Sequence, residues 1–255
     1  MNFFKRLYLF GVFAFMYLPI LILIAYSFNN SKYSLNWSGF TLKWYDKLSE
    51  NEALLDTAIN SVLVALSSSL LATFLGTIGA VAFFRYRFIG KKLLNAIVFI
   101  LIMSPEIVMG IALLMLFVLL NVELGFNSLL IAHISFSLPF VIVTVMSRLS
   151  GFDKNIIEAA LDLGANEFGV FRLVILPNIF PAVLAGFLLS FTLSLDDVII
   201  SFFVSGTEFE ILPIKIFSMV RLGVSPEINA LSAIMFTLTI LIVAFTQFLT
   251  KEKNR

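Results

Sequence analysis

The sequence predicts an all-α membrane protein with six transmembrane helices. Hydrophobic residues make up 60% of its 255 residues and charged residues 13%, whereas soluble domains contain about 45–50% apolar and about 25% charged residues. A helix needs roughly 20 mostly apolar residues to cross a bilayer, and runs of this length favour helices over the short alternating strands of an outer-membrane barrel. Six such runs lie near residues 7–28, 58–84, 93–120, 128–147, 180–204 and 230–249.

The rest of the composition excludes several classes of function. A net charge of +1 excludes the concentrated basic excess of a nucleic-acid-binding protein. The absence of cysteine excludes disulfides, thiolate metal sites and cysteine catalysis. His133, the one histidine, cannot form a His-rich metal site alone. We expect it to be a satisfied residue in helix packing.

The basic residues predict the orientation of the chain. Lys5 and Arg6 precede the first run, as in a signal peptide, but the run is too long, contains Pro19 and lacks a small-residue cleavage site, so we expect it to be retained. Twelve of the 17 lysines and arginines lie at the two termini and in loops 85–92 and 148–179. The positive-inside rule therefore predicts cytoplasmic termini. Residues 1–255 are expected to form a single membrane domain.

The cytoplasmic loop 148–179 has the pattern of two short helices joined by a glycine. Residues 154–163 form the first predicted helix, and Gly164 can adopt the positive φ of a helix C-terminus. A second helix is expected over about 166–175, with Pro177 ending it before the fifth span. Such a knob protrudes into the cytoplasm. The alternative is an ordinary solvated connecting helix.

The same loop resembles the EAA loop of ABC importer permeases. That loop reads E-A-A, three residues, G, nine residues and I-x-L-P, and this chain departs from it only in Val174, where isoleucine is usual. The resemblance implies the type I ABC importer permease fold and a coupling helix that docks on a separate ATPase. The residues that it assigns to ATPase coupling are Glu158, Ala159, Ala160, Gly164, Leu176 and Pro177.

No phosphate-binding loop of the form G-x-x-x-x-G-K-[ST] occurs in the sequence; Gly90-Lys91-Lys92 lacks both the first glycine and the hydroxyl. We therefore expect a transport subunit and not an enzyme. No cofactor is expected in this chain, and ATP and Mg²⁺ would be bound by the partner ATPase.

Three acidic residues fall within the predicted spans: Glu106, Asp196 and Asp197. An acid at mid-membrane costs about 2.5–3.5 kcal/mol on the insertion scale, and no lysine or arginine lies in a span core to neutralise these three. Carboxylates without a fixed cation suit a diffusible substrate with several positive charges. The alternatives are protonated carboxyls that hydrogen-bond between helices, or a contact with a second permease subunit.

Helical spacing predicts where these acids point. Adjacent positions differ by about 100°, so Asp196 and Asp197 cannot face the same way. A polar stripe shares one face of the fifth span and comprises Ser190, Ser194, Asp197 and Ser201. Glu106 follows Pro105, where a freed carbonyl opens the third span locally. The predicted substrate pathway therefore includes Glu106, Ser194, Asp196 and Asp197.

Two further residues are candidates for the pathway. Trp44, in the outer loop 29–57, has a ring suited either to an interfacial belt or to a cation–π contact with an amine at the outer mouth. Glu167, in the second half of the inner loop, is either a surface charge or a contact at the inner exit.

Further segments narrow the resemblance to the permeases of spermidine/putrescine importers. They are Leu195-Asp196-Asp197, Ile211-Leu212-Pro213-Ile214-Lys215-Ile216 and Val224-Ser225-Pro226-Glu227-Ile228-Asn229-Ala230-Leu231. This resemblance implies a heterodimer with a second permease, two copies of an ATP-binding subunit and a periplasmic polyamine-binding protein, in the bacterial inner membrane. Alternatives are the same machine carrying ferric ion, thiamine or an anion, a proton-coupled secondary transporter, and a membrane scaffold.

Overall fold

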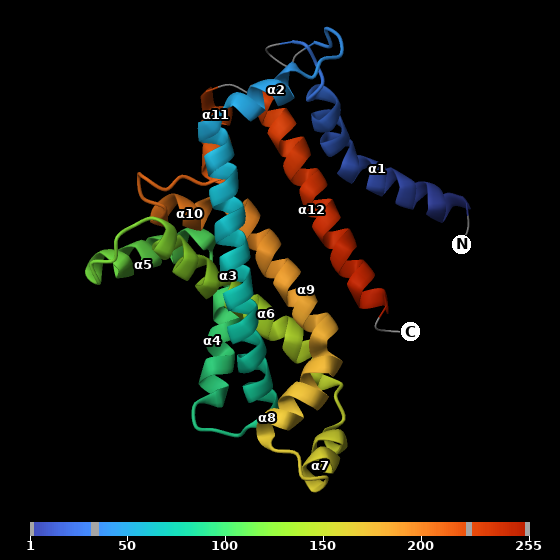
Figure 1. Cartoon of the computed structure of the whole chain (residues 1–255), viewed down its shortest axis with the longest axis vertical. Helices are drawn as coiled ribbons and strands as arrows, with labels where there is room; N and C mark the ends of the chain where they lie inside the picture. Colours follow the sequence, from blue (N-terminus) through green and yellow to red (C-terminus); the bar gives the residue numbers. More distant parts are fainter. Residues whose placement is uncertain (1–2, 32–35, 223–225, 253–255) are drawn as a thin grey trace. The chain divides into compact units, whose positions relative to one another are not determined.

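The computed structural model describes residues 3–31, 36–222 and 226–252 of the chain (Figure 1). Within these ranges the only β-structure is an isolated antiparallel bridge between Asn29 and Phe40. The helices are α1 (Phe3–Tyr26), α2 (Lys43–Glu50), α3 (Glu52–Arg85), α4 (Lys91–Met103), α5 (Glu106–Leu119), α6 (Phe126–Ser150), α7 (Lys154–Asp162), α8 (Glu167–Gly169), the π-helix η1 (Val170–Ile175), α9 (Leu176–Asp196), α10 (Ile199–Val204), α11 (Leu212–Leu222) and α12 (Pro226–Glu252). Five helices in the described part can cross a membrane by length and composition, or six when the bent pair α4 and α5 counts as one span. The all-helical class is confirmed, and the orientation of the termini stays a prediction.

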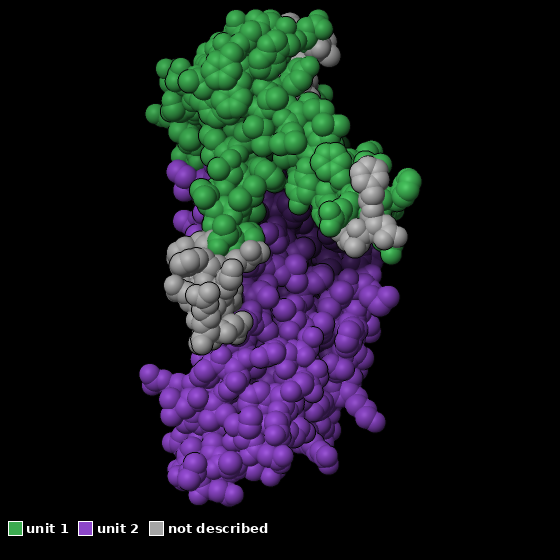
Figure 2. All heavy atoms as spheres, turned by 90° about the vertical axis from the view of Figure 1, so that its right-hand side faces the viewer, with its two compact units in different colours: residues 1–57, 215–255 green, residues 58–214 purple. Residues whose placement is uncertain are grey.

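The chain forms two compact units: residues 1–57 with 215–255, and residues 58–214 (Figure 2). Each contains apolar helices long enough to span a membrane, α1 and α12 in the first unit and α6 and the helix 167–196 in the second. The division therefore does not separate a water-soluble part from a membrane part.

The third predicted span, near residues 93–120, is interrupted at Pro105. Helix α4 ends at Met103, and α5 begins at Glu106 at an angle of 114°. Pro105 has φ −61°, and Ser104 before it is extended with ψ 136°. Proline removes a helical hydrogen bond and disfavours helical backbone at the residue before it. The backbone is therefore open at Pro105, as expected, but the opening is a complete break.

The fifth predicted span, near residues 180–204, is not one helix with those limits. One continuous helix runs from Glu167 to Asp196, through α8, η1 and α9. Pro177 does not end a loop helix, because it lies in the first turn of α9, where a missing N–H is tolerated, after a wider π-helical turn. The helix ends at Asp196, and α10 begins separately at Ile199.

Small residues bring three long helices of the second unit together. Val141 of α6 is fully buried. A Cβ atom added at Gly76 of α3 would lie 2.6 Å from its Cγ1, and one added at Gly186 of α9 would lie 3.2 Å from the same atom. Helices in membranes approach closely where such small residues meet. The Val141 side chain therefore occupies the space left by the missing Cβ atoms of both glycines.

This contact makes Gly76→Ala destabilising. The added methyl must displace Val141, and overpacking of this kind costs typically about 1–3 kcal/mol. We expect a lower thermal midpoint for the assembled transporter. The matched control is Gly79→Ala, whose Cβ meets its nearest atom at an ordinary 3.6 Å. Equal midpoints for the two variants would contradict the close approach at Val141.

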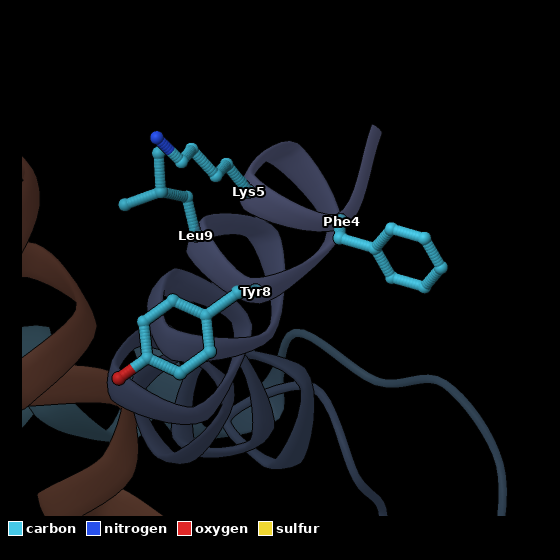
Figure 3. Close-up of a pocket in the computed structure, with 4 residues that line it drawn as sticks. All are labelled: Phe4, Lys5, Tyr8 and Leu9. Atoms are coloured by element: carbon cyan, nitrogen blue, oxygen red, sulfur yellow. The ribbon is translucent and has the colours of Figure 1, made fainter. Parts of the chain in front are cut away.

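In the first unit, α12 packs against α1 and α2. Most of α1 is exposed, including Phe4 (80%) and Tyr8 (72%). A shallow hollow on α1 is lined by Phe4, Lys5, Tyr8 and Leu9 (Figure 3). Lys5 and Leu9 lie side by side in Figure 3 and Phe4 points away from them. The hollow belongs to one helix and is almost entirely apolar, as expected of a helix surface that meets lipid or another subunit.

Candidate functional site

Asp197 interrupts the fifth span by capping a new helix. Its backbone leaves the helical region (φ −67°, ψ 119°) after α9 ends. Its carboxylate then accepts hydrogen bonds from the first turn of α10: Oδ1 from the Ile200 N–H (3.2 Å), and Oδ2 from the N–H (2.8 Å) and hydroxyl (2.7 Å) of Ser201. Aspartate is among the best N-cap residues, because its side chain satisfies the N–H groups that a helix start leaves free. The side chain is buried.

A buried histidine joins this cap to the other helices. The His133 ring, on α6, lies 2.9 Å through Nε2 from the Ser201 hydroxyl and 2.5 Å through Nδ1 from the Ser194 hydroxyl. The Asp197 Oδ2 atom lies 3.6 Å from Nε2. Ser194 also contacts the Ser68 hydroxyl of α3, at 3.2 Å. We refer to these five residues, Ser68, His133, Ser194, Asp197 and Ser201, as the His133 network.

The hydrogen bonds of the His133 network have one consistent direction. An ionised carboxylate accepts only, so Ser201 donates to Asp197 and accepts from His133 Nε2–H. In the neutral ring, Nδ1 then accepts from Ser194, which can accept from Ser68. His133 is therefore a satisfied packing residue, as expected from the sequence. It is also a polar neighbour of the buried acid Asp197, a role that a count of lysines and arginines in the spans does not predict.

The sequence predicts that the polar stripe lies on one continuous helix, and the structure shows that it does not. Ser194 lies on α9 and Ser201 on α10, and Asp197 lies in the break between them. Three of its four members still meet, because His133 collects them across the break. The fourth, Ser190, is buried but outside the network, and its hydroxyl has no partner among the described residues.

Asp196 and Asp197 are placed very differently. Asp196, the last residue of α9, is exposed, whereas Asp197 is buried. Glu106 is exposed in the first turn of α5, at the other helix break. Within the described residues, neither Glu106 nor Asp196 forms an ion pair. These are the two predicted pathway acids that remain available to a mobile cation.

The two interrupted helices pack against each other. A Cβ atom at Gly110 of α5 would lie 2.7 Å from the Phe203 ring and 3.3 Å from Ile200 Cα, both on α10. Helices α5 and α10 lie side by side in Figure 1. Discontinuous helices are a common way for transporters to present polar groups inside a membrane. The two helices that begin at the breaks, α5 and α10, therefore pack against each other.

The structure places Trp44 in a closed environment. The Trp44 side chain is buried, and Nε1 donates to the Asn29 carbonyl at 2.7 Å. The amino groups of Lys43 and Lys47 lie 4.6 and 5.3 Å from its ring centroid. The cations at this ring are thus the chain's own lysines, which favours a packing role over a contact with a substrate amine.

Glu167 forms a bidentate ion pair with Arg85 at the end of α3. The distances are 2.7 Å from Arg85 Nη1 to Oε2 and 2.8 Å from Nη2 to Oε1. The Tyr86 hydroxyl donates to Oε2 at 3.2 Å. Two parallel bonds give such a pair geometric specificity. Glu167 is therefore neither a free surface charge nor an unoccupied acid, and it fastens the start of the helix 167–196 to α3.

The inner loop contains the first of the two predicted short helices as α7, and the second is the start of the long helix 167–196. Asp153 caps α7 by accepting from the Asn155 N–H at 2.9 Å, and Gly164 has φ +85°, the left-handed conformation expected at a helix C-terminus. Ile157 is buried against the core, while Glu158 and Ala159 are exposed. Leu163 is 89% exposed. An exposed face on a helix that is anchored from behind suits docking to another subunit.

These features define the class of protein: a helical membrane permease with an exposed short helix in its EAA-like loop and with interrupted apolar helices. The chain belongs to the family of binding-protein-dependent transport system inner membrane components, whose sequence profile matches residues 72–251. Such a subunit is a transport component of the inner membrane and not an enzyme, and it works with another permease, an ATPase and a binding protein.

Individual relatives narrow the comparison. The chain is 52% identical to the spermidine/putrescine transport system permease protein PotC of Escherichia coli K12, over 96% of this chain and 93% of that one. It is 40% identical to the putrescine transport system permease protein PotI of the same strain, over 88% and 82%. Among solved structures, a bacterial ABC transporter that imports the acidic polysaccharide alginate matches with a TM-score of 0.74 at 16% identity, over 99% of this chain and 98% of that one. The last similarity establishes the ABC importer permease fold.

Proposed function

We propose that this chain is the permease subunit of an ATP-driven importer of the polyamines spermidine and putrescine, and that it forms half of the translocation pathway. The similarity to polyamine permeases over almost the whole chain is the observation that carries the proposal. The chemistry of the breaks supports it, because Glu106 and Asp196 are exposed acids without a described cationic partner. Polyamines are flexible chains of ammonium groups, which such carboxylates can receive.

The polar residues of the proposed pathway have two different roles, contact with the substrate and support of the helix break. Asp196 and Glu106 replace water around the ammonium groups of the substrate. Asp197 and Ser194 hold the break in place through the His133 network and contribute negative potential from behind. Binding must remain modest, because a site that holds a trication too tightly would not release it.

The energy comes from partner subunits. We propose a heterodimer with a second permease, two copies of an ATP-binding subunit that hold ATP and Mg²⁺, and a periplasmic polyamine-binding protein. Helix α7 docks on one ATPase through the exposed residues around Glu158 and Ala159. Closure of the ATPase pair on ATP moves this knob as a rigid body and opens the permease outward, and hydrolysis returns it inward.

The test is uptake of labelled spermidine and putrescine by cells that lack their own polyamine importers and carry this chain with its partners. We expect Asp196→Asn to lower uptake about tenfold, because a lost contact of about 1.4 kcal/mol corresponds to that factor. Glu106→Gln should act in the same direction. The matched control is Glu123→Gln, which neutralises an exposed acid away from both breaks.

Three outcomes separate the possibilities at equal membrane abundance. Uptake that falls in Asp196→Asn but not in Glu123→Gln supports a cation pathway at the helix break. Uptake that is unchanged in both keeps the polyamine assignment and refutes the role of Asp196. No uptake by the assembled wild-type complex refutes the polyamine assignment and directs the search to another solute.

A further inference from the structure

The loop between α3 and α4 lies at the same end of the second unit as α7 (Figure 1). This loop lines a basic hollow. It has a volume of about 630 Å³ and is formed by the end of α3, the following loop, the start of α4, and α6. Arg87, Lys91 and Lys92 supply its charge. Phe83, Leu93 and Met146 supply apolar walls. A volume of this size is within the range of small-ligand sites, about 300–1,000 Å³.

The three cations of the hollow are available to an anion. Within the described residues none of them forms an ion pair, and the nearby Glu167 is already engaged by Arg85. Lys91 Nζ donates to the Tyr86 carbonyl at 3.0 Å, which leaves two of its protons free. Helix α4 starts here with no capping side chain and no acid in its first turn. Its N-terminal partial charge therefore adds to the positive potential.

The apolar surroundings favour a lipid over a soluble anion. Ile89 is fully exposed at the tip of the loop, and Phe88 (40%) and Leu93 (66%) are also exposed. They alternate with the basic residues along the chain, at the end of two apolar spans. A soluble phosphate would use the cations but leave these side chains in water. A phospholipid uses both, with its phosphate among the cations and its acyl chains along the apolar walls.

We infer that this hollow is a binding site for an anionic phospholipid of the inner leaflet, with Arg87, Lys91 and Lys92 as the headgroup contacts. The hollow shares no lining residue with the predicted solute pathway or with α7, and it does not depend on which solute is carried. Basic hollows between membrane helices on the cytoplasmic side are suited to such headgroups. A lipid held here fills the gap between α3, α4 and α6 at the membrane surface.

Native mass spectrometry of the assembled complex in detergent tests the inference, with phosphatidylglycerol and phosphatidylcholine of identical acyl chains as probes. We expect preferential retention of phosphatidylglycerol by the wild type. Each of Arg87→Gln, Lys91→Gln and Lys92→Gln should weaken retention about fivefold, and the triple variant more than tenfold. The matched control is Arg172→Gln, an exposed basic residue of the same predicted side that lies outside the hollow.

Each result decides for or against the site. Loss of phosphatidylglycerol in the hollow variants with retention in Arg172→Gln supports it. Equal retention in all variants, or no preference for phosphatidylglycerol, overturns it. Displacement of the lipid by inorganic phosphate at low millimolar concentration overturns it in favour of a soluble anion. If the triple variant does not assemble, the single variants decide, because each keeps three of the four basic residues that orient loop 85–92.

Discussion

Asp197→Ala is expected to destabilise the assembled transporter by about 1–3 kcal/mol, the range for leaving buried hydrogen-bond donors without their acceptor. The substitution leaves the first N–H groups of α10 without their cap and His133 without its carboxylate. Because α10 packs on α5, the loss should spread to the helix that begins at Glu106. The measurement is the thermal midpoint of the purified complex, together with membrane abundance.

The neighbouring acid provides the control. Asp196→Ala removes an exposed carboxylate at the adjacent position, so it should lower uptake while leaving the thermal midpoint near the wild-type value. Asp197→Asn should recover most of the stability, since asparagine is also a good N-cap. If Asp197→Ala and Asp196→Ala gave the same midpoint, the structural role of Asp197 would be refuted.

The spans could be predicted from composition because a run of about 20 apolar residues has few alternatives in a chain this hydrophobic. The break at Pro105 also has a local cause, since proline acts on its own helix and on the residue before it. The sequence of the EAA loop was likewise informative, because Gly164 sets the turn through its own backbone freedom.

The break after Asp196 has only one local signal in the sequence, the N-cap aspartate Asp197. No proline or glycine lies between Leu195 and Ser201, and helical spacing continues through the segment. Asp197 leaves the helix while its carboxylate caps α10, and the His133 network that surrounds it joins residues 61 and 68 positions apart. Such a contact depends on how α6, α9 and α10 pack, and a periodicity argument along one helix does not contain it.

The same reason explains why sequence patterns leave two roles open for Glu167, a surface charge or a contact at the inner exit. Its partner, Arg85, lies 82 residues away at the end of another helix. Their pairing follows only from the meeting of α3 and α8.

Reversing either charge of the Arg85–Glu167 pair is expected to reduce uptake about tenfold, a change of about 1.4 kcal/mol. Arg85→Glu or Glu167→Arg places two like charges where two parallel hydrogen bonds now hold α3 to the start of the helix 167–196. That helix follows the coupling loop and ends at Asp196, so a loose start should weaken transmission from the knob to the break. The measurement is uptake together with ATP hydrolysis by the same complexes, since hydrolysis should persist while uptake falls.

The double reversal, Arg85→Glu with Glu167→Arg, restores opposite charges and should recover at least half of the uptake. Arg172→Glu is the control for a charge change in the same loop, because Arg172 has no ion-pair partner among the described residues. An equal loss of uptake in Arg172→Glu would attribute the effect to loop charge instead of the pair.

Recovery of uptake in the double variant distinguishes the two roles predicted for Glu167. A contact with a cationic substrate at the inner exit requires a carboxylate at position 167, and the double variant has an arginine there. Uptake restored by that arginine can only come from the bond between α3 and the helix that leads to Asp196.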